Sequence, residues 1–211
     1  MSLHPDVLQG AQADVLRMLA RPVTEAGFYL AGGTALALHL GHRRSVDFDW
    51  FTEKPFPDPL VLAQRLRDAG IPFVTASTER GTLHGTAADV QVTFLEYRYP
   101  LLKPTVFWPD FGCPLAALED IACMKLSAVA QRGTMKDFID VYALGQSGLT
   151  LKAMLDCYQR KYGVKDIAHV LYGLAYFDDA EREKAPYLVW KLEWQDVKRS
   201  IQTWLKQFSG Q

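Results

Sequence analysis

The segment Phe28–Phe51, FYLAGGTALALHLGHRRSVDFDWF, constrains the fold more than any other part of the chain. It begins with a short apolar run, passes through two adjacent glycines, and continues with the spacing of a short helix and a second strand. In its last part, VDFDW, apolar and acidic residues alternate. A strand there would place Asp47 and Asp49 on one face and the apolar side chains on the other. The pattern predicts a strand–turn–helix–strand unit with two carboxylates beside a glycine turn.

These glycines and aspartates together suit a metal-bound nucleoside triphosphate. Gly32 and Gly33 lack a Cβ atom, so the backbone can turn sharply and bring its N–H groups close to an anion. Thr34 follows as a predicted N-cap, at a helix start that favours negative charge. Neighbouring carboxylates repel each other unless a cation lies between them, and Mg²⁺ prefers hard oxygen ligands. We therefore expect Asp47 and Asp49 to bind Mg²⁺ beside the triphosphate.

Either part of this motif alone would be weak evidence for a site. A double glycine before a helix is often only a tight turn, and an Asp-x-Asp pattern is usually the solvated face of a strand. The joint arrangement is more specific. Asp49 also lies between Phe48 and Trp50, which is an apolar context for a surface carboxylate. The combination therefore favours a functional site.

The chain also resembles a known family. GGTALALHLGHRRSVDFDWF, together with EDIACMKLSAVAQRGTMKDFIDVYAL and LAYFDDAE, is similar to the nucleotidyltransferase AbiEii/AbiGii toxin family, from about Gly27 to about Glu181. The resemblance implies a polymerase-β-like nucleotidyltransferase fold and the toxin of a toxin–antitoxin or phage-defence system. It also implies transfer of a nucleoside monophosphate from a nucleoside triphosphate to a hydroxyl group of RNA, such as tRNA, or of protein. The implied partners are the triphosphate, Mg²⁺ and a cognate antitoxin protein.

The resemblance adds residues from the second half of the chain to the predicted site. Lys125 and Lys136 lie in family motifs and would hold triphosphate oxygens, while Asp137 would act as a base on the acceptor hydroxyl. The predicted catalytic set is then Asp47, Asp49, Lys125 and Asp137, and the predicted nucleotide-binding set is Gly32, Gly33, Thr34, Ser45 and Lys136.

A third metal-binding carboxylate is an open question. Many relatives of the polymerase-β type carry one on a strand after the Asp-x-Asp motif. In the strand predicted over DVQVTFLEYRY the middle position is Thr93, and Asp89 lies at its start. Asp89 is either a third metal ligand with Asp47 and Asp49 or an ordinary turn residue.

Two other functions are consistent with the same segment. Thr93 at the place of a carboxylate would fit a catalytically impaired module of this fold that binds a nucleotide or a partner protein. Transfer of the γ-phosphate, as in a kinase, ranks last because the chain has no HRD, DFG or GxxxxGK[ST] element.

The rest of the pattern predicts an α+β fold in two parts. Residues 1–112 would form a nucleotidyltransferase-like mixed sheet flanked by helices, and residues 113–211 a helical bundle. Pro22 is expected to end the first helix, and the proline-rich stretch Pro100–Pro114 is expected to be the connecting loop. Helices are expected over 5–21, 59–69, 119–131, 135–144, 149–162, 166–177 and 193–208, and a strand meander over 71–99. Asp58 and Thr150 are expected to be N-caps, and Gly163 a C-cap.

Composition excludes some classes and limits others. A chain of 211 residues, 49% of them hydrophobic, can bury a substantial core. Its formal net charge of −1 provides no general basic field, so RNA could bind only at a local patch. Cys113, Cys123 and Cys157 lack metal-ligand spacing and are expected to be buried thiols. No signal peptide or membrane-length apolar run is evident, so we expect a cytoplasmic protein that does not enter the membrane.

Overall fold

The computed structural model describes residues 3–210, which form a mixed seven-stranded sheet and a set of helices on its two sides. The strands are β1 Tyr29–Ala31, β2 Asp47–Thr52, β3 Phe73–Glu79, β4 Thr82–Ala87, β5 Val90–Glu96, β6 Val106–Trp108 and β7 Cys113–Leu115. The helices are α1 Gln12–Glu25, α2 Gly32–Leu40, α3 Pro59–Asp68, α4 Leu118–Gln131, α5 Met135–Gln146, α6 Leu151–Tyr162, α7 Ala168–Ala175 and α8 Trp194–Ser209, with short 3-10 helices at Pro5–Val7 and Ala180–Arg182.

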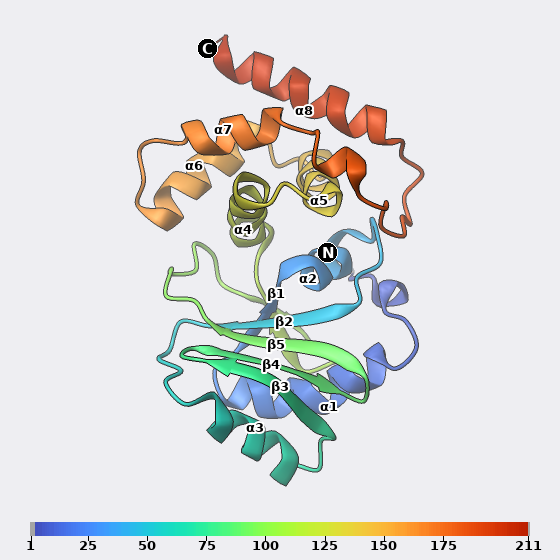
Figure 1. The fold of residues 1–211 in the computed structure, drawn as a ribbon, viewed down its shortest axis with the longest axis vertical. Coiled ribbons are helices and arrows are strands. Elements are labelled where there is room, and N and C mark those ends of the chain that lie inside the picture. The colour runs from blue at the N-terminus through green and yellow to red at the C-terminus, as the bar shows by residue number, and fades with distance from the viewer. Residues whose placement is uncertain (1–2, 211) are drawn as a thin grey trace.

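The helices are distributed unequally over the sheet, whose strand order is β3-β4-β5-β2-β1-β7-β6. Figure 1 shows α1 and α3 against one face, α2 against the other, and α4 to α8 stacked beyond α2. The predicted α+β class is confirmed, with the sheet in the first half of the chain and helices in the second. None of the helices within residues 3–210 is both long enough and apolar enough to cross a membrane.

Strand β2 lies at the centre of the sheet and carries the two aspartates. It pairs with β1 in antiparallel and with β5 in parallel orientation, so Asp49 lies opposite Ala31 on one side and Thr93 on the other. Phe48 and Trp50 are completely buried. Because successive side chains of a strand point to opposite faces, the core contacts of these two aromatic residues direct both aspartates to the other face, toward α2 and the helical layer.

Several predicted helix ends are confirmed by their caps. The Asp58 carboxylate accepts a hydrogen bond from the Leu60 N–H at 3.1 Å at the start of α3. At the start of α6 the Thr150 hydroxyl accepts one from the Ala153 N–H at 3.2 Å, and Gly163 ends that helix in a left-handed conformation. These local signals position the helices that surround the site.

Pro22 does not end the first helix, which is a correction to the prediction. It lies inside α1, near the helix end at Glu25. A proline here removes a single backbone hydrogen bond, and the complete burial of the neighbouring Val23 favours continuing the helix. The chain reverses later, at Gly27, whose φ of +89° is in the glycine-favoured region.

The stretch Pro100–Pro114 is also more ordered than predicted, because it contains β6 and most of β7. Strand β7 pairs with β1 in parallel and with β6 in antiparallel orientation, so the sheet continues past the predicted boundary at residue 112. Trp108, Cys113 and Leu115 are buried and hold this hairpin on the core. Prolines hide such strands from sequence reasoning, yet they are tolerated near a sheet edge.

Candidate active site

A cleft of about 590 Å³ lies between the open face of β2 and the helical layer. Its volume falls in the range of small-molecule sites, roughly 300–1,000 Å³. Its walls come from the segment before α1, the start of α2, the loop before β2, the strands β2 and β5, the helix α4, the start of α5 and the segment before α8. The lining residues are Gln9, Gly32, Gly33, Arg43, Arg44, Ser45, Val46, Asp47, Asp49, Phe51, Leu95, Met124, Lys125, Ala128, Arg132, Lys136, Pro186 and Tyr187.

The cleft brings together most of the residues predicted from the sequence. Those that line it are Gly32, Gly33, Ser45, Asp47, Asp49, Lys125 and Lys136. Three predicted residues, Thr34, Asp89 and Asp137, do not line it. Residues from both halves of the chain therefore meet in one crevice, as a two-part site requires.

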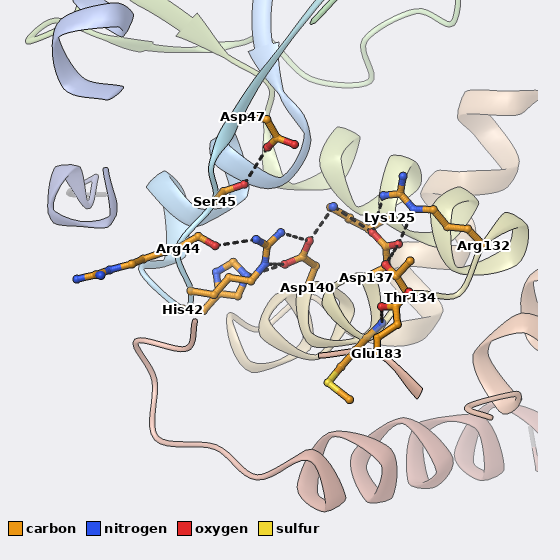
Figure 2. Close-up of polar contacts among 12 residues, drawn as sticks. His42, Arg44, Ser45, Asp47, Lys125, Arg132, Thr134, Asp137, Asp140 and Glu183 are labelled. Atoms are coloured by element: carbon orange, nitrogen blue, oxygen red, sulfur yellow. Dashed lines mark hydrogen bonds and ion pairs between the residues drawn. The ribbon is translucent and has the colours of Figure 1, made fainter. Parts of the chain in front are cut away.

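The two aspartates form the acidic part of the cleft. The Ser45 hydroxyl donates a hydrogen bond to Asp47 Oδ1 at 3.2 Å (Figure 2). Burial, together with the negative charge of Asp47, raises the pKa of Asp49 to about 6, although the cations Lys125, Arg132 and Lys136 oppose this rise. The pair therefore carries negative charge that the protein itself does not fully compensate, which is the condition for binding a cation.

The two glycines make room for charged side chains in this cleft. Gly32 has a φ of +68°, and a Cβ atom at this position would lie 2.6 Å from Asp49 Oδ2. A Cβ atom at Gly33 would lie 2.7 Å from the Arg43 Nη2 atom and 3.1 Å from the Ser45 hydroxyl. Glycine is thus required at these two positions to leave space for the neighbouring side chains, in addition to the predicted approach of the backbone to a phosphate.

Gly32→Ala should lower the free energy of unfolding by more than the roughly 1–2 kcal/mol that a left-handed conformation costs a residue with a Cβ atom. The added cost comes from displacing the Asp49 carboxylate. Gly70→Ala is the matched control, because Gly70 has a φ of +78° and nothing lies within 4 Å of its Cβ position. Urea unfolding of both variants measures the difference, and equal losses would show that the Asp49 contact is unimportant.

Asp140, from α5, organises the cations beside the cleft. Its Oδ1 atom accepts hydrogen bonds from His42 Nε2 at 2.8 Å and Arg43 Nε at 2.7 Å. Its Oδ2 atom accepts one from Arg43 Nη2 at 2.8 Å and pairs with Lys125 Nζ at 2.7 Å. Burial opposes ionisation, but the charges of Lys125 and Arg43 and these hydrogen bonds outweigh it and hold the pKa of Asp140 well below its ordinary value. Asp140 thereby fixes two cations that line the cleft.

Asp137 is buried rather than exposed to the cleft, and the role of base predicted for it does not fit. Both of its oxygens accept hydrogen bonds from Arg132, at 2.8 and 3.0 Å, and further ones come from Thr134 at 2.5 Å and Lys125 at 3.3 Å (Figure 2). Burial opposes ionisation, but these partners hold the pKa of Asp137 below its ordinary value. A fully buried carboxylate of low pKa is poorly suited to take a proton from a hydroxyl in the cleft. Its contacts instead position Lys125 and Arg132.

Thr34 also has a different role from the predicted one. Helix α2 begins at Gly32, with Ala31 as the N-cap residue, so Thr34 lies inside the first turn. Its side chain is buried, and its hydroxyl donates a hydrogen bond to the backbone carbonyl of Asp47. Thr34 therefore supports the backbone of β2 and has no hydroxyl free for a phosphate.

Asp89 lies in the tight turn between β4 and β5 and does not line the cleft. Ala88 and Asp89 both have positive φ, at 44° and 67°, which a two-residue hairpin requires and which Asp tolerates. Within residues 3–210 no group of three or more His, Cys, Asp or Glu residues is placed to hold a metal ion, so Asp89 does not complete a triad with Asp47 and Asp49. Thr93, opposite Asp49, makes a hydrogen bond with His84 at 3.2 Å.

Among the cleft residues that sequence reasoning missed are three arginines and a tyrosine, Arg43, Arg44, Arg132 and Tyr187. The first two arginines stand in the quoted GHRRS run, and the third ends the KLSAVAQR segment, so a signal for them was present. The lining contains five basic residues, Arg43, Arg44, Lys125, Arg132 and Lys136, against the acidic Asp47 and Asp49. Arg44 and Lys136 form no ion pair within the described residues. The cleft is thus a local basic patch on a chain without a general one.

Burial raises the pKa of the Cys113 and Cys123 thiols to about 12, with the charge of Cys157 adding to the effect on Cys123. All three cysteines are buried and form no disulfide. All three are therefore buried thiols, as predicted, and none lines the cleft within the described residues.

The model of a protein family, Nucleotidyl transferase AbiEii toxin, Type IV TA system, matches residues 14–104 and 90–206 of the chain. The chain belongs to this family. The prediction of a nucleotidyltransferase made from the motifs is thereby confirmed. Among curated proteins, the uncharacterized protein aq_aa25 of Aquifex aeolicus (strain VF5) is 37% identical over 188 residues, which cover 86% of this chain and 87% of the relative.

Solved structures show the same fold at low sequence identity. The structure of JHP933 from Helicobacter pylori is similar with a TM-score of 0.59 at 16% identity, covering 98% of this chain and 93% of that one. MenT4, a nucleotidyltransferase toxin from Mycobacterium tuberculosis H37Rv, is similar with a TM-score of 0.51 at 16% identity, covering 93% of this AbiEii family chain and 82% of MenT4. The predicted nucleotidyltransferase-like fold is confirmed by these likenesses.

Proposed function

We propose that this AbiEii family protein is a Mg²⁺-dependent toxin that transfers a nucleoside monophosphate from a nucleoside triphosphate to a hydroxyl group of an RNA, such as tRNA, or of a protein. One observation carries the proposal: Asp47 and Asp49 share a cleft with the cations Lys125, Arg132 and Lys136. This arrangement provides ligands for a metal ion and positive charge for a triphosphate in one place.

The aspartate pair fits Mg²⁺ without a third carboxylate. Mg²⁺ is usually held by one or two carboxylates, with water and substrate phosphate oxygens completing its shell. Asp47 and Asp49 would supply the protein ligands, and the space that Gly32 leaves beside Asp49 Oδ2 keeps that oxygen accessible. When bound, Mg²⁺ would neutralise phosphate charge.

The other cleft residues would bind and orient the triphosphate. Lys125 is held by Asp137 and Asp140, and Arg132 by Asp137, so both cations are fixed before the substrate arrives. Lys136 lies at the start of α5 and has no such restraint. Fixed cations stabilise developing charge better than mobile ones, because they need no reorganisation during the reaction. The backbone at Gly32 and Gly33 would contact the phosphates, with Ser45 orienting Asp47.

Asp47→Asn should reduce transfer of an α-phosphate label to a mixture of cellular RNA and protein by at least about 100-fold, because it removes a charged metal ligand. Asp156→Asn, at an exposed site on α6, is the control and should retain full transfer. Circular dichroism checks that both variants are folded. Retained labelling by Asp47→Asn would refute the site, and transfer of a γ-phosphate label instead would indicate a kinase.

The structure also keeps a second candidate function open, a nucleotide- or partner-binding module without catalysis. Thr93, opposite Asp49 in the parallel strand β5, is the observation that favours it, because a third metal carboxylate is missing there. Calorimetry separates the two functions. Binding of a nucleoside triphosphate with Mg²⁺ and no label transfer to RNA or protein would favour the module.

The proposed toxin role has a cellular test. Induced expression should arrest growth, the Asp47→Asn variant should relieve the arrest, and a cognate antitoxin encoded beside the toxin should do the same. We propose a cytoplasmic location, where nucleoside triphosphates and tRNA are available. Arrest that persists in Asp47→Asn would separate toxicity from nucleotidyl transfer.

A further inference from the structure

Between the second 3-10 helix and α8, the chain returns from the helical half to the cleft. We call residues 183–190 the strap. At its start, the Glu183 carboxylate accepts a hydrogen bond from the Met135 N–H at 3.0 Å, at the first residue of α5 (Figure 2). At its end, the N–H groups of Val189 and Trp190 donate to the carbonyl oxygen of His42 at 2.9 and 3.0 Å. The strap is therefore held at both ends, by the Glu183 side chain at its start and by its backbone at its end.

Tyr187 lies in the middle of the strap, at the mouth of the cleft. Tyr187 is 61% exposed although its ring contacts the Arg44 side chain. The Arg44 guanidinium lies 4.0 Å from the centre of the Tyr187 ring. The backbone N–H of Arg44 donates a hydrogen bond to the backbone carbonyl oxygen of Tyr187 at 2.9 Å. Among residues 3–210, Arg44 forms no ion pair with a carboxylate. A guanidinium without a carboxylate partner thus lies over one face of a partly exposed ring.

The two ends of the cleft differ in character. One end is formed by the apolar side chains Phe51, Leu95, Met124 and Ala128, from β2, β5 and α4. The other contains Arg44 and Tyr187, and Figure 2 shows the Arg44 side chain pointing away from Asp47 and Lys125. At the apolar end, Phe51 and Leu95 are paired on neighbouring strands and face the cleft with Met124 and Ala128 of α4, which suits the base of a small donor. The strap end opens to solvent, which suits a macromolecular acceptor.

We propose that Arg44 and Tyr187 form the acceptor platform, on which the unpaired terminal base of an RNA strand stacks while Arg44 contacts a neighbouring phosphate. Unpaired RNA bases are commonly bound by stacking on aromatic rings and arginine guanidinium groups, with cations on the backbone. A single ring beside a single cation matches one splayed base and its phosphate. Base pairs of a duplex would not present a free face in this way. The proposal depends on the nucleotidyl transfer proposed above and specifies which residues position its acceptor.

A fluorescent probe tests the platform without relying on catalysis. The probe is a short single-stranded RNA with 2-aminopurine at its 3′ end, whose fluorescence is quenched by stacking. We expect quenching by the wild-type protein and by Tyr187→Phe. Tyr187→Ala should weaken binding about 5- to 150-fold, the range expected for one stacked base. Tyr172→Ala is the matched control, since Tyr172 is 72% exposed on α7 and does not line the cleft.

The strap should survive the Tyr187→Ala substitution, because its anchors are the Glu183 carboxylate on the Met135 N–H and the backbone of Val189 and Trp190 on His42, and the Tyr187 side chain takes part in neither. Absence of quenching by the wild-type protein, or equal quenching in Tyr187→Ala, would overturn the platform. Quenching of 2-aminopurine riboside triphosphate that is lost in Tyr187→Ala would assign the ring to the donor and would also overturn the platform. A blunt duplex carrying the same terminal base, which is already quenched by its own stacking, should show no further change when the protein is added.

Steady-state kinetics then separate this proposal from the proposed function. With RNA as the acceptor, Tyr187→Ala should raise the KM for RNA by the same 5- to 150-fold and leave the KM for the nucleoside triphosphate unchanged. An unchanged KM for RNA in an active enzyme would overturn the platform alone. If the wild-type protein transfers no label but Tyr187-dependent quenching is seen, the platform stands and the nucleotidyl transfer fails.

Discussion

Asp140→Ala should lower the free energy of unfolding by about 3–5 kcal/mol, the range measured when one partner of a buried ion pair is removed. Asp140 is completely inaccessible to solvent and accepts from His42, Arg43 and Lys125. Without its carboxylate the buried Arg43 guanidinium loses its only carboxylate partner among the described ion pairs. Lys125 keeps a single, longer contact of 3.3 Å with Asp137. The desolvation cost of both cations then remains without the interaction that offset it.

Asp156→Ala is the matched control for this prediction. Asp156 pairs with Lys152 at 3.0 Å on the surface of α6, where both side chains are more than half exposed. Its removal should change the free energy of unfolding by no more than about 0.5 kcal/mol, because exposed pairs between residues i and i+4 contribute little. Urea unfolding near pH 7.5, followed by circular dichroism, measures both variants. A similar loss in the two would mean that Asp140 does not organise the cations.

Asp140→Ala should also lower label transfer, because Asp140 positions cations of the cleft without contacting the substrate itself. Asp140 does not line the cleft, but Arg43 and Lys125 do. At a temperature where Asp140→Ala is still folded, label transfer should fall because these two cations are no longer fixed. Asp140→Asn preserves the shape of the side chain, so it separates the effect of charge from that of a cavity. Full transfer by a folded Asp140→Ala would show that the fixed cations are dispensable.

The sequence was most informative where a local pattern determines the structure. The alternation in VDFDW was sufficient to place Asp47 and Asp49 on one face of a strand, and buried aromatic residues on the other face confirm it. Capping residues such as Asp58 and Thr150 marked helix starts correctly, because a cap depends on neighbours in the chain. These features need no knowledge of distant contacts.

Features that depend on distant contacts could not be predicted. The contact of Tyr187 with Arg44 joins residues from opposite ends of the chain, and no spacing reveals it. Asp137 was a reasonable base in a family motif until the structure showed three partners around it. Glu183, which caps the start of α5, gave no local signal either. Charge type was visible in the sequence, but whether a charge is already neutralised was not.

Asp49→Asn should raise the free energy of unfolding of the metal-free protein by up to about 3 kcal/mol near pH 8, while label transfer falls by at least about 100-fold. Burial and the charge of Asp47 raise the pKa of Asp49 from its ordinary value of 3.8 to about 6. A difference of about two pKa units corresponds to roughly 3 kcal/mol between the protonation states. The ionised carboxylate therefore destabilises the fold, and a neutral amide of the same shape removes this cost. The wild-type protein is thus less stable than the Asn variant, but it keeps a negative charge that can bind a metal ion.

The pH dependence of this gain provides its strictest test. Between about pH 4 and pH 6 the folded protein binds more protons at Asp49 than the unfolded chain does, so wild-type stability falls as the pH rises through this window. Asn does not titrate, and the gain from Asp49→Asn should shrink to about 1 kcal/mol near pH 4.5, where Asp49 is largely protonated in the folded protein. Unfolding is measured in the presence of a chelator, with Asp156→Asn as a variant that should gain nothing at either pH. A loss of stability in Asp49→Asn near pH 8, or a gain that does not change with pH, would show that the ionised Asp49 carboxylate does not destabilise the fold. The pair would then lack the uncompensated charge from which cation binding at the cleft is inferred.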